Sequence, residues 1–477
     1  MSSVIGFLLQ VYWSGNEFNN NHKNSVYIMQ TPDQAHVIRR LGTFTATSIV
    51  VANMIGTGIF TTTGLMAAHL PGPAWILLCW LLGGLIAMTG AICYSELATR
   101  MPDEGGEYLY LKRLYHPALG FLTGWTSLFV GFSAPIAAAA LSFSEYTFAG
   151  LNIPAGSDQI NHIILYKKIT AISVIAIFTL IHYWGIRLGA GVQNFLTVIK
   201  IAIVLGLALA GIWVGTGNIA ALSFSGYETS GLLGIGTAMM LVMFSYSGWN
   251  ASAYIAGELK TPQRSLPVSL ISGTLIVAFL YLLLNIFILD ALTYPELQGV
   301  IAVVEAASVK TFGRWIGDVL GLLIGIALLA SLSAFILIGP RVYYAMARDG
   351  LFFSFASRVH PRHKVPGRSI LLQGLIATIM VIAGTFQQLI IYVSFALSIF
   401  TWIAVAGIFI ARRQQIGEEQ AVKIMGYPYT PLFFLLSTFI LMVVTYITQP
   451  LESTAAIITV LCGIPFYQLW IKSAAPH

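Results

Sequence analysis

Two apolar stretches of this 477-residue chain carry residues whose types and spacing suggest binding chemistry. The first runs Met54-Ile-Gly-Thr-Gly-Ile-Phe60, and the second runs Phe244-Ser-Tyr-Ser-Gly-Trp-Asn250. Glycine and hydroxyl residues are weak helix formers, and a glycine costs about 1 kcal/mol relative to alanine in a helix. A helix interrupted there exposes N–H groups at the start of its second half and carbonyls at the end of its first half. The N–H groups suit a carboxylate and the carbonyls suit an ammonium group, so the pair of stretches predicts a site for a zwitterion.

We therefore predict that both stretches contact a bound solute. The candidates are Met54, Ile55, Gly56, Thr57, Gly58, Phe244, Ser245, Tyr246, Ser247, Gly248 and Asn250. The competing interpretation is that Gly56 and Gly58 only let neighbouring helices approach closely. Interruptions in both stretches favour binding over packing. Tyr246 and Trp249 either cover the solute or belong to the core.

Lys200 is a third candidate because it lies within an apolar stretch with no acidic residue near it in the sequence. A charged side chain in a membrane helix is costly and usually faces the protein interior. Its ammonium group could occupy the place of a bound sodium ion or release a proton. The alternative is that it reaches back to the membrane surface. Ser331 and Ser333 could line a coupling site beside it, or could form ordinary helix–helix hydrogen bonds.

The composition requires that membrane helices position these residues. The chain is 57% hydrophobic and only 9% charged, and its mean hydropathy is +0.81. About a quarter of the residues in a soluble domain are charged. The deficit excludes a disordered protein, a nucleic-acid binder and an ordinary soluble enzyme.

Stretches without Asp, Glu, Lys or Arg predict twelve membrane-spanning helices. They run approximately 43–68, 74–95, 118–144, 169–186, 193–214, 231–256, 268–289, 317–340, 369–386, 389–411, 431–449 and 453–471. The run 369–411 is about twice the length of a span, and Gln387-Gln388 would form the turn between its two helices. The interrupted spans begin two groups of five, at about 43–214 and 231–411. Because five is odd, the second group would have inverted topology, a pattern that points to a transporter site.

Basic residues set the predicted orientation. With the N-terminus inside, the outer side receives only Lys167, Lys168, Lys310 and Arg314, and nearly all other basic residues lie on the inner side. Both termini are then cytoplasmic. Residues 37–477 form the membrane domain, and we interpret residues 1–36 as a disordered cytoplasmic tail with no assigned function.

The remaining polar residues give weaker signals. Glu96 and Glu258 lie at the inner ends of their spans, where we expect structural pairing with arginines, and Glu107 is expected to shape the loop between spans two and three. Cys79, Cys93 and Cys462 all fall in apolar stretches, so no disulfide framework is predicted. No cluster has the spacing of a metal site or a catalytic centre, so we expect neither an enzyme nor a cofactor. A channel is also not indicated, because no ring of charges or filter motif occurs.

Four segments together resemble the amino acid–polyamine–organocation transporters, over about residues 37–475. They are Met54–Phe60, Tyr94–Tyr108 running into Gly120–Trp125, Phe244–Asn250 continuing through Ala256–Arg264 to Pro267, and Arg341–Gly350. The resemblance implies an all-α membrane protein with the leucine-transporter-like five-plus-five inverted repeat and discontinuous first and sixth helices. The segment Ser247-Gly-Trp-Asn250 is most similar to the L-type neutral amino acid branch.

The resemblance also implies residue roles. The backbone of Ile55–Gly58 would bind the substrate carboxylate, carbonyls around Phe244–Ser247 would bind its ammonium group, and Lys200 would replace a sodium ion. Two features depart from the family pattern. Asn53 stands where relatives often have a small or apolar residue, and no extracellular cysteine is present, so no covalent heavy-chain partner is expected.

The sequence thus predicts a sodium-independent transporter of neutral L-amino acids in the plasma membrane, working by exchange. The alternatives are a proton-coupled symporter with Lys200 as the titrating group, and a membrane sensor that binds an amino acid without moving it. Small residues at Thr57 and Ser247 favour alanine or serine as substrate. No acidic residue lies within the interrupted stretches, which argues against cationic substrates.

Overall fold

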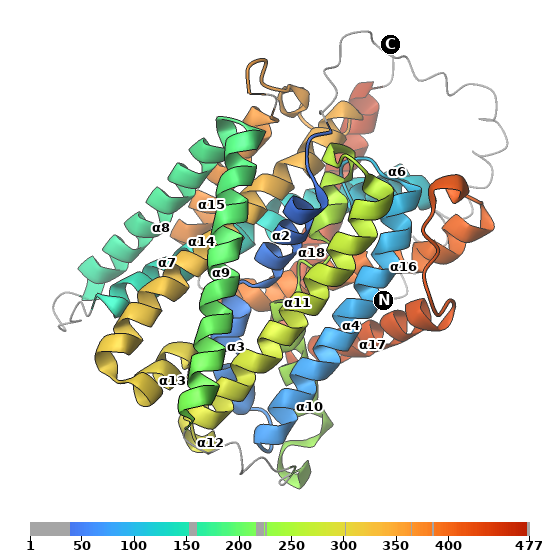
Figure 1. Cartoon of the computed structure of the whole chain (residues 1–477). Helices are drawn as coiled ribbons and strands as arrows, with labels where there is room; N and C mark the ends of the chain where they lie inside the picture. Colours follow the sequence, from blue (N-terminus) through green and yellow to red (C-terminus); the bar gives the residue numbers. More distant parts are fainter. Residues whose placement is uncertain are drawn as a thin grey trace.

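The computed structural model describes residues 39–151, 160–215, 224, 227–300, 302–363, 365–383 and 386–474. Within these ranges the regular elements are helices, and the β-type pairing is a single isolated bridge between Leu41 and Leu259. Ten helices of the described ranges are long and apolar enough to cross a membrane. The bundle in Figure 1 therefore confirms an all-α membrane protein.

The first part of the bundle contains the interrupted first span and four further spans. Its helices are α2 (Thr43–Met54), α3 (Thr57–Ala67), α4 (Pro73–Arg100), α5 (Glu107–Leu114), α6 (Pro117–Thr126), the π-helix η1 (Ser127–Ser133), α7 (Ala134–Gly150), α8 (Ile160–Tyr183) and α9 (Ile186–Val214). The elements α6, η1 and α7 follow one another without a break and form one span.

The second part begins with the other interrupted span. Its helices are α10 (Tyr227–Tyr246), the 3-10 helix η4 (Ala251–Glu258), α11 (Pro262–Ala291), α12 (Tyr294–Leu297), α13 (Val303–Phe312), α14 (Arg314–Arg348), η5 (Ser354–Ser357), α15 (Gly367–Ala383), α16 (Phe386–Arg413), η6 (Glu418–Gln420), α17 (Tyr429–Thr448) and α18 (Pro450–Ala474).

Ten of the twelve expected spans correspond to these long apolar helices. The other two, 231–256 and 369–386, correspond to α10 and α15, and α15 is only 17 residues long. The number twelve and the inverted repeat therefore stay predictions, and residues 1–36 lie outside the described residues. Gln387 and Gln388 lie in the first turn of α16, which begins at Phe386, so the expected turn at this pair is wrong.

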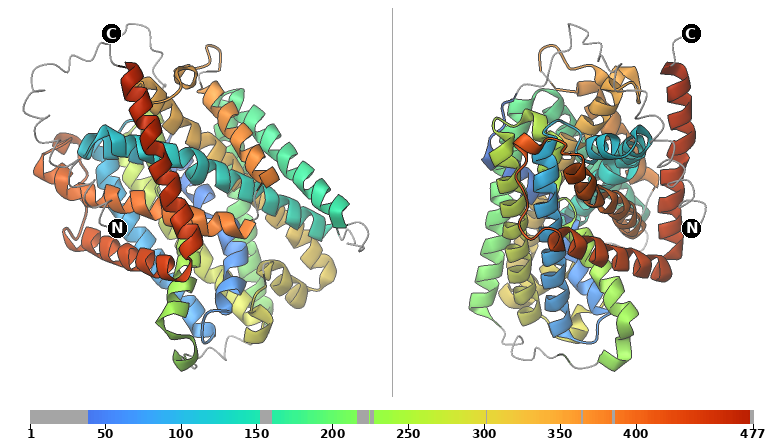
Figure 2. Two further views of the ribbon diagram at one scale, coloured as in Figure 1. Left: turned by 180° about the vertical axis from the view of Figure 1, so that it is seen from behind. Right: turned by 90° about the vertical axis from the view of Figure 1, so that its right-hand side faces the viewer.

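The interrupted first span is the centre of the bundle. Of its most apolar window, 89% of the residues are buried, against 22% for α17 and for α18. Helix α11 packs along both α2 and α4, and α14 packs along α7 and α9. Helices α17 and α18 lie at the periphery, and α18 runs along one side of the molecule in Figure 2.

Buried ion pairs connect helices at one end of the bundle, where the loop between α4 and α5 lies. Glu96 accepts hydrogen bonds from Arg100 (3.0 Å) and from Arg412 on α16 (2.7 Å). Glu258, at the end of η4, accepts from Arg341 on α14 (2.6 Å). A buried acid without a partner would be strongly destabilising, so these pairs hold the helix ends together. The expected structural pairing of both acids is confirmed.

Candidate functional site

The first span is interrupted where the sequence predicted. Helix α2 ends at Met54 and α3 begins at Thr57. Between them Gly56 has an extended backbone (φ −110°, ψ −153°), and no side chain caps the N-terminus of α3. The first N–H groups of α3 are therefore free of a capping side chain, and the positive end of the helix dipole lies there.

The second interruption lies between α10 and η4. The amide of Ser247 donates to the carbonyl of Phe244 (3.0 Å) as the helix ends. Gly248 follows with a φ of +95°, a backbone conformation that favours glycine. The chain becomes helical again at Ala251, in the tighter 3-10 form. The two interruptions are therefore real features of the backbone.

The two interruptions lie against each other. A Cβ atom added to Gly58 would lie 2.7 Å from the Cα of Ser245, and one added to Gly248 would lie 2.9 Å from the Cβ of Asn53. Neither position has room for a side chain, so close packing does explain Gly58. Gly56 is different, because a Cβ there would meet only the Met54 carbonyl, at 3.9 Å.

A cavity of about 110 Å³ borders both interruptions. Most of the predicted contact residues line it: Met54, Gly56, Thr57, Gly58, Phe244, Ser245, Ser247, Gly248 and Asn250. Ile55 and Tyr246 are not among the lining residues, and the Tyr246 hydroxyl donates to the Trp80 carbonyl (3.0 Å). The structure thus places the Tyr246 side chain in the core, whereas Trp249 borders the cavity.

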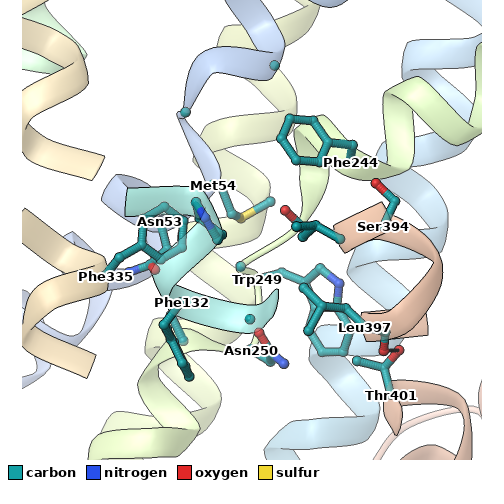
Figure 3. Close-up of a pocket in the computed structure, with 18 of the residues that line it drawn as sticks. Asn53, Met54, Phe132, Phe244, Trp249, Asn250, Phe335, Ser394, Leu397 and Thr401 are labelled. Atoms are coloured by element: carbon teal, nitrogen blue, oxygen red, sulfur yellow. Dashed lines mark hydrogen bonds between the residues drawn. The ribbon is translucent and has the colours of Figure 1, made fainter. Parts of the chain in front are cut away.

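Aromatic and hydroxyl side chains from other helices complete the cavity wall. In Figure 3, Phe132 and Phe335 lie on one side, and Ser394, Leu397 and Thr401 of α16 lie on the other. Trp249 and Asn250 lie between them. The walls therefore combine apolar surface with a few polar groups, as small-molecule sites do.

Lys200 is fully buried in α9 and points to the first interruption. Its Nζ donates to the carbonyl of Ala52 (3.2 Å), to the carbonyl of Ile55 and to the Oγ of Ser331 (2.6 Å). These three acceptors use all three ammonium donors. The alternative that the lysine reaches the membrane surface is therefore wrong, because its polar end is held at the end of α2.

The two serines of α14 lie in different places. Ser331 accepts from Lys200 and donates to the carbonyl of Ile55 (2.5 Å). Ser333 is 2.8 Å from the Nε2 of the buried His182. Ser331 thus belongs to the lysine site and also lines the cavity, whereas Ser333 contacts α8 and is separate from both.

Two residues of the site could not be assigned from the sequence. The hydroxyl of Tyr281 on α11 lies 2.5 Å from the Met54 carbonyl and 2.8 Å from the Ser245 carbonyl, so it connects both interruptions. Glu107 lines the cavity, and its Oε1 accepts from the Asn250 side chain (2.7 Å). A hydroxyl within an apolar span was a possible signal for Tyr281. The signal for Glu107 was its place in a glycine-rich loop, which does not indicate its neighbours.

The chain is similar in sequence to known proteins. The family profile described as "Amino acid permease" matches residues 41–466 of the chain. The serine/threonine exchanger of Bacillus subtilis is 28% identical over 445 residues, which cover 92% of this chain and 98% of that protein. The human b(0,+)-type amino acid transporter 1 is 29% identical, with 93% and 90% covered. The human Asc-type amino acid transporter 1 is 24% identical, with 91% and 82% covered.

Proposed function

Because this chain belongs to the amino acid permease family, we propose that it exchanges small neutral L-amino acids across the plasma membrane without sodium. The substrate carboxylate binds at the N-terminus of α3, where the backbone beside Gly56 is open. The ammonium group binds at the carbonyl end of α10. Alternating access moves one set of helices against the other around this site.

The contacts of Lys200 are the observation that carries this proposal. Its ammonium group occupies the carbonyls of Ala52 and Ile55 together with the Ser331 hydroxyl. Carbonyl and hydroxyl oxygens at an unwound helix are the ligands that transporters offer to sodium. An ammonium group held at these oxygens supports transport without sodium, because it takes the place of the cation.

The nature of the walls supports a small neutral substrate. Thr57, Ser245 and Ser247 contribute short polar groups at the interruptions. The similar Bacillus subtilis protein is named as a serine/threonine exchanger. Alanine, serine and threonine are the substrates that we expect to compete best.

The proposed orientation puts the cavity on the cytoplasmic side of the interruptions. On the α3 side the hydroxyls of Thr62 and Ser245 are 2.9 Å apart, and Tyr146 donates to the Phe60 carbonyl (3.3 Å). The lining residue Glu107 begins α5, which follows the inner end of α4 in the proposed orientation. With both termini cytoplasmic, we therefore propose that these α3 contacts lie on the outer side of the interruptions and that the cavity is reached from the inner side.

Purified protein in liposomes tests the exchange. Uptake of labelled L-alanine is compared between empty vesicles and vesicles loaded with L-serine, in sodium and in choline buffers. We expect uptake only into loaded vesicles and equal rates in both buffers. Uptake that requires a sodium gradient, with no effect of internal serine, would contradict the proposal.

Proton symport is the second candidate, because Lys200 is buried among neutral partners and could release a proton. A proton gradient imposed on empty vesicles separates the two functions. Symport requires accumulation driven by the gradient alone, whereas exchange requires internal amino acid whatever the gradient.

A further inference from the structure

Glu107 gives the cavity an acidic group that the interruptions themselves lack. Among the described residues that line the cavity it is the only Asp, Glu, Lys or Arg. It is the first residue of α5, in the connection between two spans, and is 1% exposed. A carboxylate at this position costs solvation energy, which needs an explanation.

The partners of Glu107 are neutral donors. Its Oε1 accepts from the hydroxyl of Tyr94 (2.6 Å) and from the side-chain amide of Asn250 (2.7 Å). The titratable groups that face it are Tyr94 from α4, Tyr110 from α5 and Tyr254 from η4, and none is charged near neutral pH. The ion pairs of the described residues do not include Glu107. The carboxylate is therefore hydrogen-bonded but has no counter-ion.

Burial raises the pKa of Glu107 to about 7, although hydrogen bonds from Tyr94, Asn250 and Tyr254 oppose the shift. The group therefore changes charge within the physiological range. A nearby cation would favour its ionised form. The cavity itself contains no such cation among the described lining residues.

Glu107 lies close to the end of α10. Asn250, which donates to it, is two residues beyond Gly248, and two residues span at most about 7 Å. The carboxylate thus lies close to the second interruption and on the side of the cavity that the proposed orientation makes cytoplasmic. A solute leaving the interruptions in that direction passes it.

We propose that the Glu107 carboxylate is a second anchor for the substrate ammonium group, used on the cytoplasmic side as substrate enters from or leaves to the cytoplasm. The inference rests on the proposed transport of amino acids. The ammonium group moves from the carbonyls at the end of α10 to Glu107, which supplies the missing charge partner. The extracellular step does not use this anchor, so the two faces of the transporter bind substrate with unequal affinity.

The test measures KM separately on each side of oriented proteoliposomes. In Glu107→Gln we expect the cytoplasmic KM for L-alanine to rise about tenfold or more, because the substrate loses one charge-assisted hydrogen bond. The extracellular KM should stay unchanged. Glu104→Gln is the matched control, since Glu104 lies in the same loop, contacts Gly257 and does not line the cavity. A cytoplasmic KM in Glu107→Gln equal to that of the wild type would overturn the anchor. Failure of the wild type to transport alanine would instead overturn the proposed function.

Internal pH gives a second reading that does not depend on the glutamine variant folding. With a pKa of about 7, the ionised fraction of Glu107 falls from about 0.9 at pH 8 to about 0.1 at pH 6. The cytoplasmic KM of the wild type should therefore rise about tenfold as internal pH falls through this range. Glu107→Asp should keep a pH dependence and Glu107→Gln should lose it. A cytoplasmic KM of the wild type that is flat between pH 6 and pH 8 would contradict the proposal.

Discussion

At the scale of single residues, the site depends on groups that each connect two separate elements. Lys200 joins α9 to the end of α2, and Tyr281 joins α11 to both interruptions. The sequence singled out Lys200 because a charge in an apolar stretch is costly wherever its partners lie. It could not single out Tyr281, whose importance comes from two carbonyls that the fold brings to one hydroxyl.

Replacing Lys200 tests whether its buried ammonium group is needed for exchange. In Lys200→Ala the carbonyls of Ala52 and Ile55 lose a buried donor. We expect exchange to fall about tenfold or more, because an unmade buried hydrogen bond costs about 1–3 kcal/mol and 1.4 kcal/mol is a factor of ten. Labelled alanine counterflow measures this, with Lys423→Ala, an exposed lysine on the surface, as the control. Exchange at the wild-type rate in Lys200→Ala would show that the ammonium group is not needed.

At the scale of elements, the interruptions divide two spans into halves that are tied to different neighbours. The chain before α2 pairs with the end of η4, where the amide of Lys260 donates to the Leu41 carbonyl (3.0 Å). Glu258 then joins η4 to α14 through Arg341. The half of the first span before its interruption, α2, is therefore linked to the half of the other span after its interruption, η4.

The places of the interruptions could be predicted because glycine and hydroxyl residues are a local signal. The surroundings of Glu107 could not, because its donors come from α4 and from the residue that precedes η4. Contacts between segments that are distant in the sequence decide these surroundings, and composition does not reveal such contacts.

Filling the open space beside Gly56 tests whether the N-terminus of α3 binds the substrate carboxylate. Gly56→Leu places a side chain at the uncapped N-terminus of α3, where the carboxylate is proposed to bind. We expect loss of alanine binding with little loss of thermal stability in detergent. Gly206→Leu is the control, because an added Cβ at Gly206 has nothing within 4 Å and this glycine is exposed on α9, away from the interruptions. Normal alanine binding in Gly56→Leu would show that the substrate carboxylate does not bind beside Gly56.

At the scale of the whole molecule, the helices surround one cavity that borders both interruptions. Hydrogen bonds join α3 to α7 and to α10 beside the interruptions, and residues of η1, α14 and α16 line the cavity. A site that is closed on one side and reachable from the other is what alternating access requires at each step. In the function that we propose, the unwound backbone at the centre determines which solutes are carried.

The most direct measurement of the central claim is a competition series on the purified protein, with labelled L-alanine as the bound ligand. L-Alaninamide lacks the carboxylate, and L-lactate lacks the ammonium group, while both keep the size of alanine. Because one interruption is proposed to hold each charged group, unlabelled L-alanine and L-serine should displace the label and neither analogue should do so. Displacement by L-alaninamide or by L-lactate as effective as that by L-alanine would contradict recognition of a zwitterion by the two interrupted helices.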